Sequence, residues 1–182
     1  ALANTLADIR LVPFSAIADR LRIAFRDVVG KLGKQAQLKI SGEETVLDRR
    51  VLDELADPLL HLLRNSLDHG VESPAERQAS GKSPNANITL TARHQSGMLL
   101  IEVRDDGRGI DPEVVRRKVV DRRMVDAATA ERLTRAELME FLFLPGFSTK
   151  QAVTELAGRG VGLDGVQSMV HAVSGSVTLD SE

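Results

Sequence analysis

Three short motifs, each rich in glycine or polar residues, constrain this chain more than any other feature. They are HLLRNSLDHG at residues 61–70, DDGRGI at residues 105–110 and GRGVGL at residues 158–163. A single short Gly-rich match often arises by chance. Three motifs in this order, each with different chemistry, together predict a nucleotide-binding pocket.

The spacing of apolar residues predicts the elements that carry these motifs. Helical spacing runs from Leu2 to Leu32, and Pro13 should end one helix and begin another. Asp48 is a suitable start for a long helix reaching His69 and Gly70, inside which Pro58 is unfavourable and can bend the helix. We further expect strands at 35–41, 87–94, 98–104 and 176–179, helices at 75–79, 112–125, 135–143 and 162–173, a turn at 95–97 and a mobile loop at 144–158.

Composition limits the classes of protein to consider. With 182 residues and 42% hydrophobic content, the chain is long enough for one main domain with a sizeable core. It has no cysteine, so disulfides and thiolate metal sites are excluded.

A net charge of −2 gives no global field for nucleic acid or anionic lipid, and no apolar run approaches the ~20 residues of a membrane span. We therefore expect a soluble, cytoplasmic protein with no membrane span and no nucleic-acid partner. The start without methionine and the end just after a predicted strand suggest a piece of a longer protein.

His61 and Asn65 are the chemically informative pair of the first motif. Four residues apart, they project from one face of a helix. The amide oxygen of Asn65 suits Mg²⁺, which takes few protein ligands when phosphates supply the rest. His61 could orient or deprotonate a group that attacks the γ-phosphate. The alternative is a polar pair that simply faces solvent.

The second motif places a carboxylate and two glycines at the end of a strand. Asp105 can accept a hydrogen bond from the exocyclic amine of adenine, and guanine has a carbonyl at that position. Gly107 and Gly109 remove side chains that would block a flat ring from the backbone. The alternative is an ordinary turn, in which Asp and Gly are common.

The third motif precedes a predicted helix. The spaced glycines Gly158, Gly160 and Gly162 leave backbone amides bare at a helix N-terminus, which suits phosphate binding. Arg159 and Lys150 could add positive charge there. A flexible connector with solvated charges is the alternative.

The remaining aromatic and histidine residues fit structural roles better. Phe141, Phe143 and Phe147 are expected to pack in the core, as an apolar hinge under a loop that closes on nucleotide. His94 at a strand end and His171 in the last helix are expected to be structural or surface residues.

Taken together, the motifs resemble the ATP-binding kinase domain of the CheA family of chemotaxis-type sensor histidine kinases. HLLRNSLDHGVE resembles the N box of that family, VRDDGRGID its G1 box, FLFLPGFSTK its F box and lid, and GRGVGLDGVQ its G2 box. The resemblance implies an α+β fold: a two-layer α/β sandwich of the gyrase, Hsp90, histidine kinase and MutL class, with a mixed sheet and helices on one face.

The resemblance also implies roles for individual residues. It gives Mg²⁺ coordination to Asn65, phosphate-side roles to His61 and His69, and adenine recognition to Asp105. Arg64 and Asp68 would orient neighbours. The implied catalytic residues are His61 and Asn65, and the implied ATP-binding residues are Asn65, Asp68, His69, Asp105, Gly107, Gly109, Ser148, Lys150, Arg159, Gly160 and Gly162.

A domain division and a set of partners follow from the same resemblance. Residues 10–14 resemble the junction between a dimerisation hairpin and the kinase domain, so residues 1–12 would end a dimerisation helix and its linker. Residues 13–182 would be the catalytic domain, truncated before a further Gly-Thr box. The implied partners are a histidine phosphotransfer domain, response regulators, receptor and coupling proteins bound through other domains, and a second copy of the full-length protein.

Three functions are compatible with these motifs. The leading one is transfer of the ATP γ-phosphoryl group to a histidine on a separate domain, in two-component signalling. An ATPase of the same fold is the second, but such proteins usually have glutamate where His61 stands. A non-catalytic scaffold is the third, and the presence of Asn65, Asp105 and the last glycines argues against it.

Overall fold

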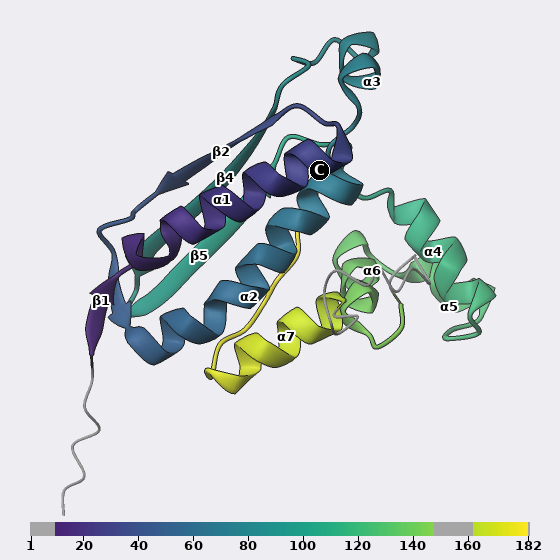
Figure 1. Ribbon diagram of the computed structural model, residues 1–182. Helices are drawn as coiled ribbons and strands as arrows, with labels where there is room; N and C mark the ends of the chain where they lie inside the picture. Colours follow the sequence, from purple (N-terminus) through teal and green to yellow (C-terminus); the bar gives the residue numbers. More distant parts are fainter. Residues whose placement is uncertain (1–9, 148–161, 182) are drawn as a thin grey trace, which may run out of the picture. The chain divides into compact units, whose positions relative to one another are not determined.

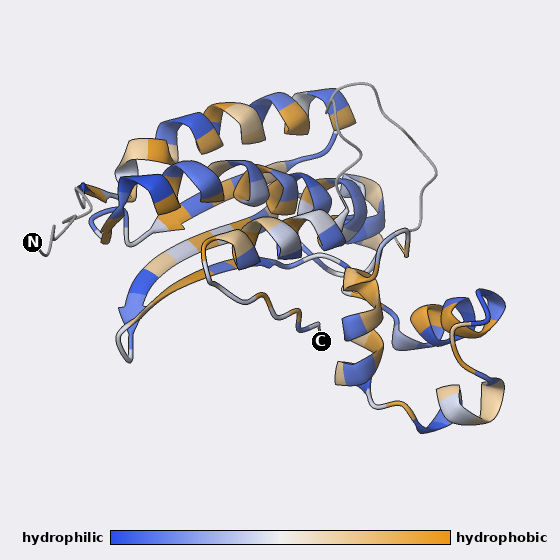
Figure 2. Cartoon of the chain, turned by 90° about the horizontal axis from the view of Figure 1, so that it is seen from below, coloured by the Kyte–Doolittle hydropathy of each residue, from blue (hydrophilic) through white to orange (hydrophobic). Residues whose placement is uncertain are grey.

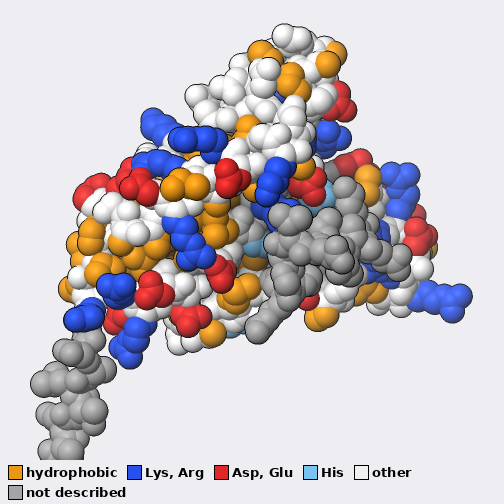
Figure 3. Space-filling view, in the orientation of Figure 1, with side chains coloured by type: hydrophobic (Ala, Val, Ile, Leu, Met, Phe, Trp, Pro, Cys, Tyr) orange, Lys and Arg blue, Asp and Glu red, His pale blue; other side chains and the backbone are white. Residues whose placement is uncertain are grey.

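The computed structural model describes residues 10–147 and 162–181. The chain divides into two compact units, which we describe separately: the first ends at Arg108 and the second begins at Gly109. On the face drawn in Figure 3, acidic and basic side chains are interspersed, as expected from the nearly balanced charge. Within the described residues, no helix is both long and apolar enough to cross a membrane.

The first unit contains a mixed sheet. Its order within the described residues is β2 (Ala36–Ser41), β4 (Ala86–Gln95) and β5 (Met98–Asp105). β2 is parallel to β4, and β5 is antiparallel to β4 with Ile88 opposite Asp105. Ser96 and Gly97 form the hairpin turn with φ values of 51° and 77°, the positive range that two-residue hairpin turns need. The strands predicted at 35–41, 87–94 and 98–104, and the hairpin that joins the last two, are confirmed.

Two long helices lie side by side on one face of this sheet, α1 (Ser15–Leu32) and α2 (Arg49–Asn65) (Figure 1). Their buried residues recur three or four positions apart, which gives each helix one apolar stripe. Polar and apolar residues accordingly alternate along both helices (Figure 2). Every second residue of β4 from Ala86 to Ala92 is buried. The predicted sandwich, with a mixed sheet and helices on one face, is confirmed.

The region around Pro13 differs in part from the prediction. A helix does begin just after it, but Leu11–Pro13 is a short strand, β1, that pairs antiparallel with β3 (Val46–Asp48). Proline disfavours helix in the residue before it and is tolerated at a sheet edge. Phe14 is fully buried and its N–H donates to Thr45 O at 2.8 Å, so strand pairing and burial override the helical spacing. Residues 1–9 lie outside the described residues.

The long helix α2 begins and continues as the sequence predicts. Asp48 caps it by accepting a hydrogen bond from Arg50 N at 2.8 Å. Pro58 lies inside the helix and is buried, and the helix is continuous through it. Proline leaves the carbonyl of residue 54 without its helical donor. Because Glu54 is exposed, water can serve that carbonyl. α2 is followed by a π-helical turn, η1 (Ser66–Gly70), and by α3 (Pro74–Ala79), which confirms the predicted short helix.

The second unit is helical within its described residues. It contains α4 (Pro112–Asp121), α5 (Ala127–Arg132), α6 (Arg135–Glu140), the 3-10 turn η2 (Phe141–Phe143) and α7 (Leu163–Ala172). Its core consists of Val115, Val119, Leu138, Met139 and Phe147. α5 was not predicted, because six residues show too little periodicity, although Asp126 caps it by accepting from Thr129 N at 2.9 Å.

The strand predicted at residues 176–179 is wrong. Val177 and Leu179 are half-buried and their neighbours are exposed, so the alternation that prompted the prediction is real. Within the described residues, however, the segment pairs with no strand. Leu179 packs instead against the core of the second unit. Alternating burial is therefore not sufficient for a strand, which needs a hydrogen-bonded neighbour.

Candidate nucleotide site

The C-terminal end of α2 carries the polar residues of the first motif. His61 and Asn65 lie one turn apart and are both half-buried, while Leu63 and Leu67 point into the core, at 2% and 0% exposure. The helix then widens into η1, which Val71 closes by donating its N–H to Ser66 O at 2.8 Å. Such π-turns are frequent at functional sites.

Lys34 stabilises η1 from outside the motif. It follows α1 and donates to three backbone carbonyls, those of Leu67, Asp68 and Val71, the last two at 3.0 and 2.8 Å. A cation at the C-terminal end of a helix compensates both the helix dipole and the carbonyls that lack helical donors. The sequence analysis missed this role, because the contact spans more than thirty residues.

Asp68 and His69 lie on the exposed side of η1. Their Oδ2 and Nε2 atoms are 3.5 Å apart, and the side chains are 39% and 45% exposed. Both are therefore accessible to a ligand, and the contact between them contributes little to stability because water competes for both side chains.

Asp105 ends β5 and lies directly against the end of the first motif. Its Oδ1 accepts a hydrogen bond from Gly107 N at 3.0 Å. Gly70 O accepts from Arg108 N at 2.8 Å, which joins the two motifs through the backbone. A Cβ on Gly107 would lie 2.2 Å from Gly70 O, and one on Gly70 would lie 3.0 Å from Asp105 Oδ1. The close approach therefore requires glycine at residue 107, whereas a Cβ on Gly70 would press against the Asp105 carboxylate.

An ionic cluster adjoins this junction, formed by the buried residues Glu72 and Arg77 and the more exposed Lys82 and Asp106. Arg77 is 1% exposed; its Nη1 donates to Glu72 Oε2 at 3.0 Å, and its Nη2 lies 3.1 Å from Asp106 Oδ2. Lys82 Nζ donates to Glu72 Oε1 at 2.8 Å. A buried charge is tolerated only when it is paired and hydrogen-bonded, and both buried members, Glu72 and Arg77, meet that condition. The sequence analysis did not single out these residues, although the adjacent Ser73–Glu76 capping box predicts the helix that carries Arg77.

The two carboxylates of this cluster stay ionised. Burial acts to raise the pKa of Glu72, but hydrogen bonds from Lys82 and Arg77 outweigh it and hold that pKa below its ordinary value. Burial likewise opposes ionisation of Asp106, and hydrogen bonds from Asn87 and from Arg77 lower its pKa overall.

The remaining predicted residues divide into two groups. Ser148, Lys150, Arg159 and Gly160 lie outside the described residues, as does most of the predicted loop. Gly109, with φ 69°, and Gly162, which caps the ten-residue helix α7, belong to the second unit.

The phenylalanines are packed, as predicted. Phe143 and Phe147 are 4% and 1% exposed, and the rings of Phe141 and Phe147 are 6.3 Å apart. Lys118 donates to Phe147 O at 2.6 Å and lies 4.9 Å from the centre of its ring. This anchors the chain immediately before the predicted lid.

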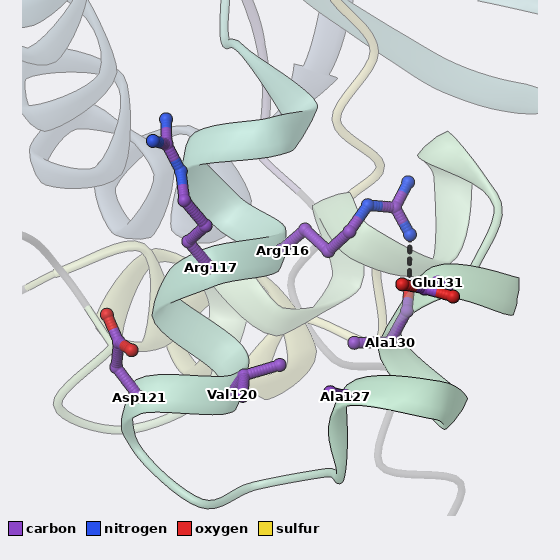
Figure 4. Close-up of a pocket in the computed structure, with 7 residues that line it drawn as sticks. All are labelled: Arg116, Arg117, Val120, Asp121, Ala127, Ala130 and Glu131. Atoms are coloured by element: carbon purple, nitrogen blue, oxygen red, sulfur yellow. Dashed lines mark hydrogen bonds between the residues drawn. The ribbon is translucent and has the colours of Figure 1, made fainter.

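A separate cavity of about 240 Å³ lies between α4 and α5 (Figure 4). Arg116 crosses beside it to donate to the carbonyls of Ala130 and Leu133, the latter at 3.3 Å, while Arg117 leaves α4 in another direction. None of the predicted site residues at 10–147 and 162–181 lines this cavity.

In the first unit, a mixed sheet covered on one face by helices brings a polar helix end against a Gly-rich turn. This defines a two-layer α/β sandwich of the nucleotide-binding type. The chain belongs to the histidine kinase-, DNA gyrase B- and HSP90-like ATPase family, whose model matches residues 54–182.

Similarity to individual proteins extends over nearly the whole chain. The chain is 45% identical to a gliding motility regulatory protein of Myxococcus xanthus over 99% of its length, covering 23% of that protein. It is 44% identical to the chemotaxis protein CheA of Treponema pallidum and 40% identical to that of Salmonella typhimurium, in both cases over 100% of its length. It covers 22% and 26% of those two proteins. The resemblance to the ATP-binding kinase domain of the CheA family is confirmed, and the chain spans about a quarter of the length of these relatives.

Proposed function

We propose that this chain is the catalytic domain of a chemotaxis-type sensor histidine kinase that transfers the γ-phosphoryl group of ATP to a histidine on a separate phosphotransfer domain. The observation that carries the proposal is the junction of Gly70, Asp105 and Gly107. Gly107 N–H anchors one oxygen of the Asp105 carboxylate, and Gly70 leaves its flank free of a side chain. A carboxylate accepts several hydrogen bonds, so an anchored Asp105 can still accept from the amine of adenine.

Asn65 fits a magnesium ion by the chemistry of its side chain. Mg²⁺ prefers oxygen ligands and is often held by one or two protein groups together with phosphates and waters. Asn65 offers one neutral amide oxygen from the last residue of α2, and its half burial leaves it accessible. When bound, the ion would neutralise charge on the phosphates.

His61 lies one turn before Asn65 and is proposed to orient or deprotonate the attacking group. His69 and Asp68, exposed on η1, are proposed to serve the phosphate side. Gly109 of the second motif, together with residues of the lid and of the last glycine motif, completes the proposed ATP site: Ser148, Lys150, Arg159, Gly160 and Gly162. For Gly162, the N-terminus of α7 supports an anion-binding role.

The partners are proposed from the relatives. Three of the proteins compared are regulators of motility or chemotaxis by name. We infer a phosphotransfer domain as substrate and response regulators as later acceptors. We further infer that other domains bind receptor and coupling proteins and that the full-length protein dimerises through the region before Pro13. The catalytic domain is proposed to run from residue 13 onward, and the protein to be cytoplasmic.

Calorimetry with the non-hydrolysable ATP analogue AMPPNP tests the site. Asp105→Asn should weaken binding by about 1–3 kcal/mol, because it replaces a charged acceptor by a neutral one. Asp27→Asn, at an exposed position on α1, is the matched control and should bind like the parent chain. Unchanged affinity in Asp105→Asn would remove Asp105 from adenine recognition.

The metal role of Asn65 is tested by the same assay with Mg²⁺ and with a chelator. Asn65→Ala should weaken binding mainly when Mg²⁺ is present, and an equal loss with the chelator would contradict metal coordination. Phosphotransfer itself is tested by adding ATP and a separate histidine phosphotransfer domain. ATP hydrolysis without phosphorylation of that domain would favour the ATPase alternative.

A further inference from the structure

Two buried or half-buried cations converge on a single peptide group, the one that joins Asp106 to Gly107. Its carbonyl oxygen accepts from Arg77 Nη1 at 3.1 Å and from Lys82 Nζ at 3.1 Å. Lys82 also donates to the next carbonyl, Gly107 O, at 2.7 Å. These are charge-assisted hydrogen bonds, roughly twice as strong as neutral ones.

The other side of the same peptide group faces Asp105. Gly107 N–H donates to Asp105 Oδ1 at 3.0 Å. The bond is trans, as are all described peptide bonds, so its C=O and N–H point in opposite directions. Holding the oxygen therefore fixes the direction of the N–H. Because hydrogen bonds in a chain polarise one another, the two cations also strengthen the bond from this N–H to the carboxylate.

We propose that Lys82 and Arg77 are positioning residues for adenine recognition, acting on the Asp105 carboxylate through the peptide group between Asp106 and Gly107. This deepens the proposed function and rests on it. Glu72 holds the two cations in place, with its carboxylate oxygens 3.0 Å from Arg77 Nη1 and 2.8 Å from Lys82 Nζ. Glu72 lies two residues after the end of η1, so the cluster ties the end of the first motif to the turn of the second.

Lys82 is the better residue to test, because its side chain is 35% exposed whereas that of Arg77 is 1% exposed. Lys82→Met keeps the length of the side chain and removes its charge and donors. Lys39→Met, at an exposed position on β2, is the matched control. Lys82→Gln keeps a donor and provides a milder variant.

The readout is calorimetric affinity for AMPPNP and for inosine triphosphate, which has a carbonyl in place of the exocyclic amine. Lys82→Met should weaken AMPPNP binding about three- to tenfold. It should change the affinity for inosine triphosphate by no more than about twofold. The AMPPNP affinity of Lys82→Gln should fall between those of the parent and Lys82→Met. In an Asp105→Asn background, Lys82→Met should have no further effect on AMPPNP. Lys39→Met should match the parent throughout.

Four outcomes would overturn the proposal. Equal losses for both nucleotides would show a general structural role, and additive effects in the double variant would show that Lys82 acts independently of Asp105. Unchanged AMPPNP affinity in Lys82→Met, with a loss in Asp105→Asn, would refute the positioning role and leave the proposed function standing. If Asp105→Asn itself binds AMPPNP like the parent, the adenine assignment and the positioning role fail together.

Discussion

Replacing Gly107 by alanine tests the contact between the first two motifs most directly. The added Cβ would lie 2.2 Å from Gly70 O and 2.4 Å from Gly70 C. Both are backbone atoms, so no side-chain rotation can relieve the clash. The two segments must separate by about 1.2–1.8 Å to reach an ordinary contact. That movement breaks the hydrogen bond from Arg108 N to Gly70 O.

The magnitude follows from three effects. Overpacking costs about 1–3 kcal/mol, and the lost hydrogen bond adds about 1 kcal/mol. Alanine also lowers the conformational entropy of the unfolded chain, which stabilises the folded state by about 0.4–1 kcal/mol. The net loss is about 2 kcal/mol, which lowers the Tm of a unit of this size by roughly 8–16 °C. Gly30→Ala is the control: it lies in α1 with nothing within 4 Å of an added Cβ, so it should stabilise by about 0.5–1 kcal/mol.

Thermal unfolding followed by circular dichroism at the helical band measures both variants, since the chain has no Trp or Tyr for fluorescence. AMPPNP binding at a temperature where Gly107→Ala remains folded should also weaken, because the separation displaces Asp105. A Gly107→Ala chain as stable as the parent, or stabilised like Gly30→Ala, would show that the two motifs do not meet at this distance.

Three further predictions concern the groups around the site. The folded-state pKa of Glu72 is lowered from 4.5, so its contribution to stability is present above pH 4.5 and is lost as the pH falls through the folded pKa. Glu72→Gln should therefore destabilise the chain at pH 7 and weaken the pH dependence of its unfolding in acid. An unaltered pH dependence would contradict the paired carboxylate. Lys34→Met should cost about 1–3 kcal/mol in urea unfolding, because it strips charge-assisted donors from η1, and a loss no larger than that of Lys39→Met would exclude this role. Leu67→Ala should cost about 2–5 kcal/mol, since Leu67 is fully buried, and a loss below about 1 kcal/mol would place it outside the core.

Local patterns account for what the sequence predicted well. The hairpin needs only alternation and a turn with positive φ, and both are visible around Ser96 and Gly97. The start of α2 needs only a capping side chain, and Asp48 provides one. The motif at residues 105–110 likewise predicted that Asp105 ends a strand. In each case, the information lies within a few residues.

Long-range contacts account for what the sequence did not predict. Lys34 reaches carbonyls 33 to 37 positions away, and Arg77 reaches Asp106 O 29 positions away. Nothing local distinguishes such side chains from solvated surface charges, which are far more common. The strand β1 depends on pairing with β3, whereas the segment at 176–179 pairs with no strand in the part of the chain that the structure describes. Pairing is a property of the fold, so periodicity alone could decide neither case.

The lysines near the site contact backbone carbonyls rather than the Asp105 carboxylate, and this bears directly on adenine recognition. Lys34 and Lys82 both end on backbone oxygens beside the two motifs. Among the described residues, no ion pair involves Asp105. The hydrogen bond to its side chain comes from the neutral N–H of Gly107. A lysine paired with Asp105 would have to be displaced before adenine could donate to it, and breaking a partly buried ion pair leaves an uncompensated charge. Arg77 and Lys82 instead hold the carbonyl side of the peptide group between Asp106 and Gly107. This orients the Asp105 carboxylate and leaves its remaining acceptor capacity for the base. Moving a cation onto Asp105 should therefore weaken adenine binding even though it adds positive charge near a site proposed to bind phosphates.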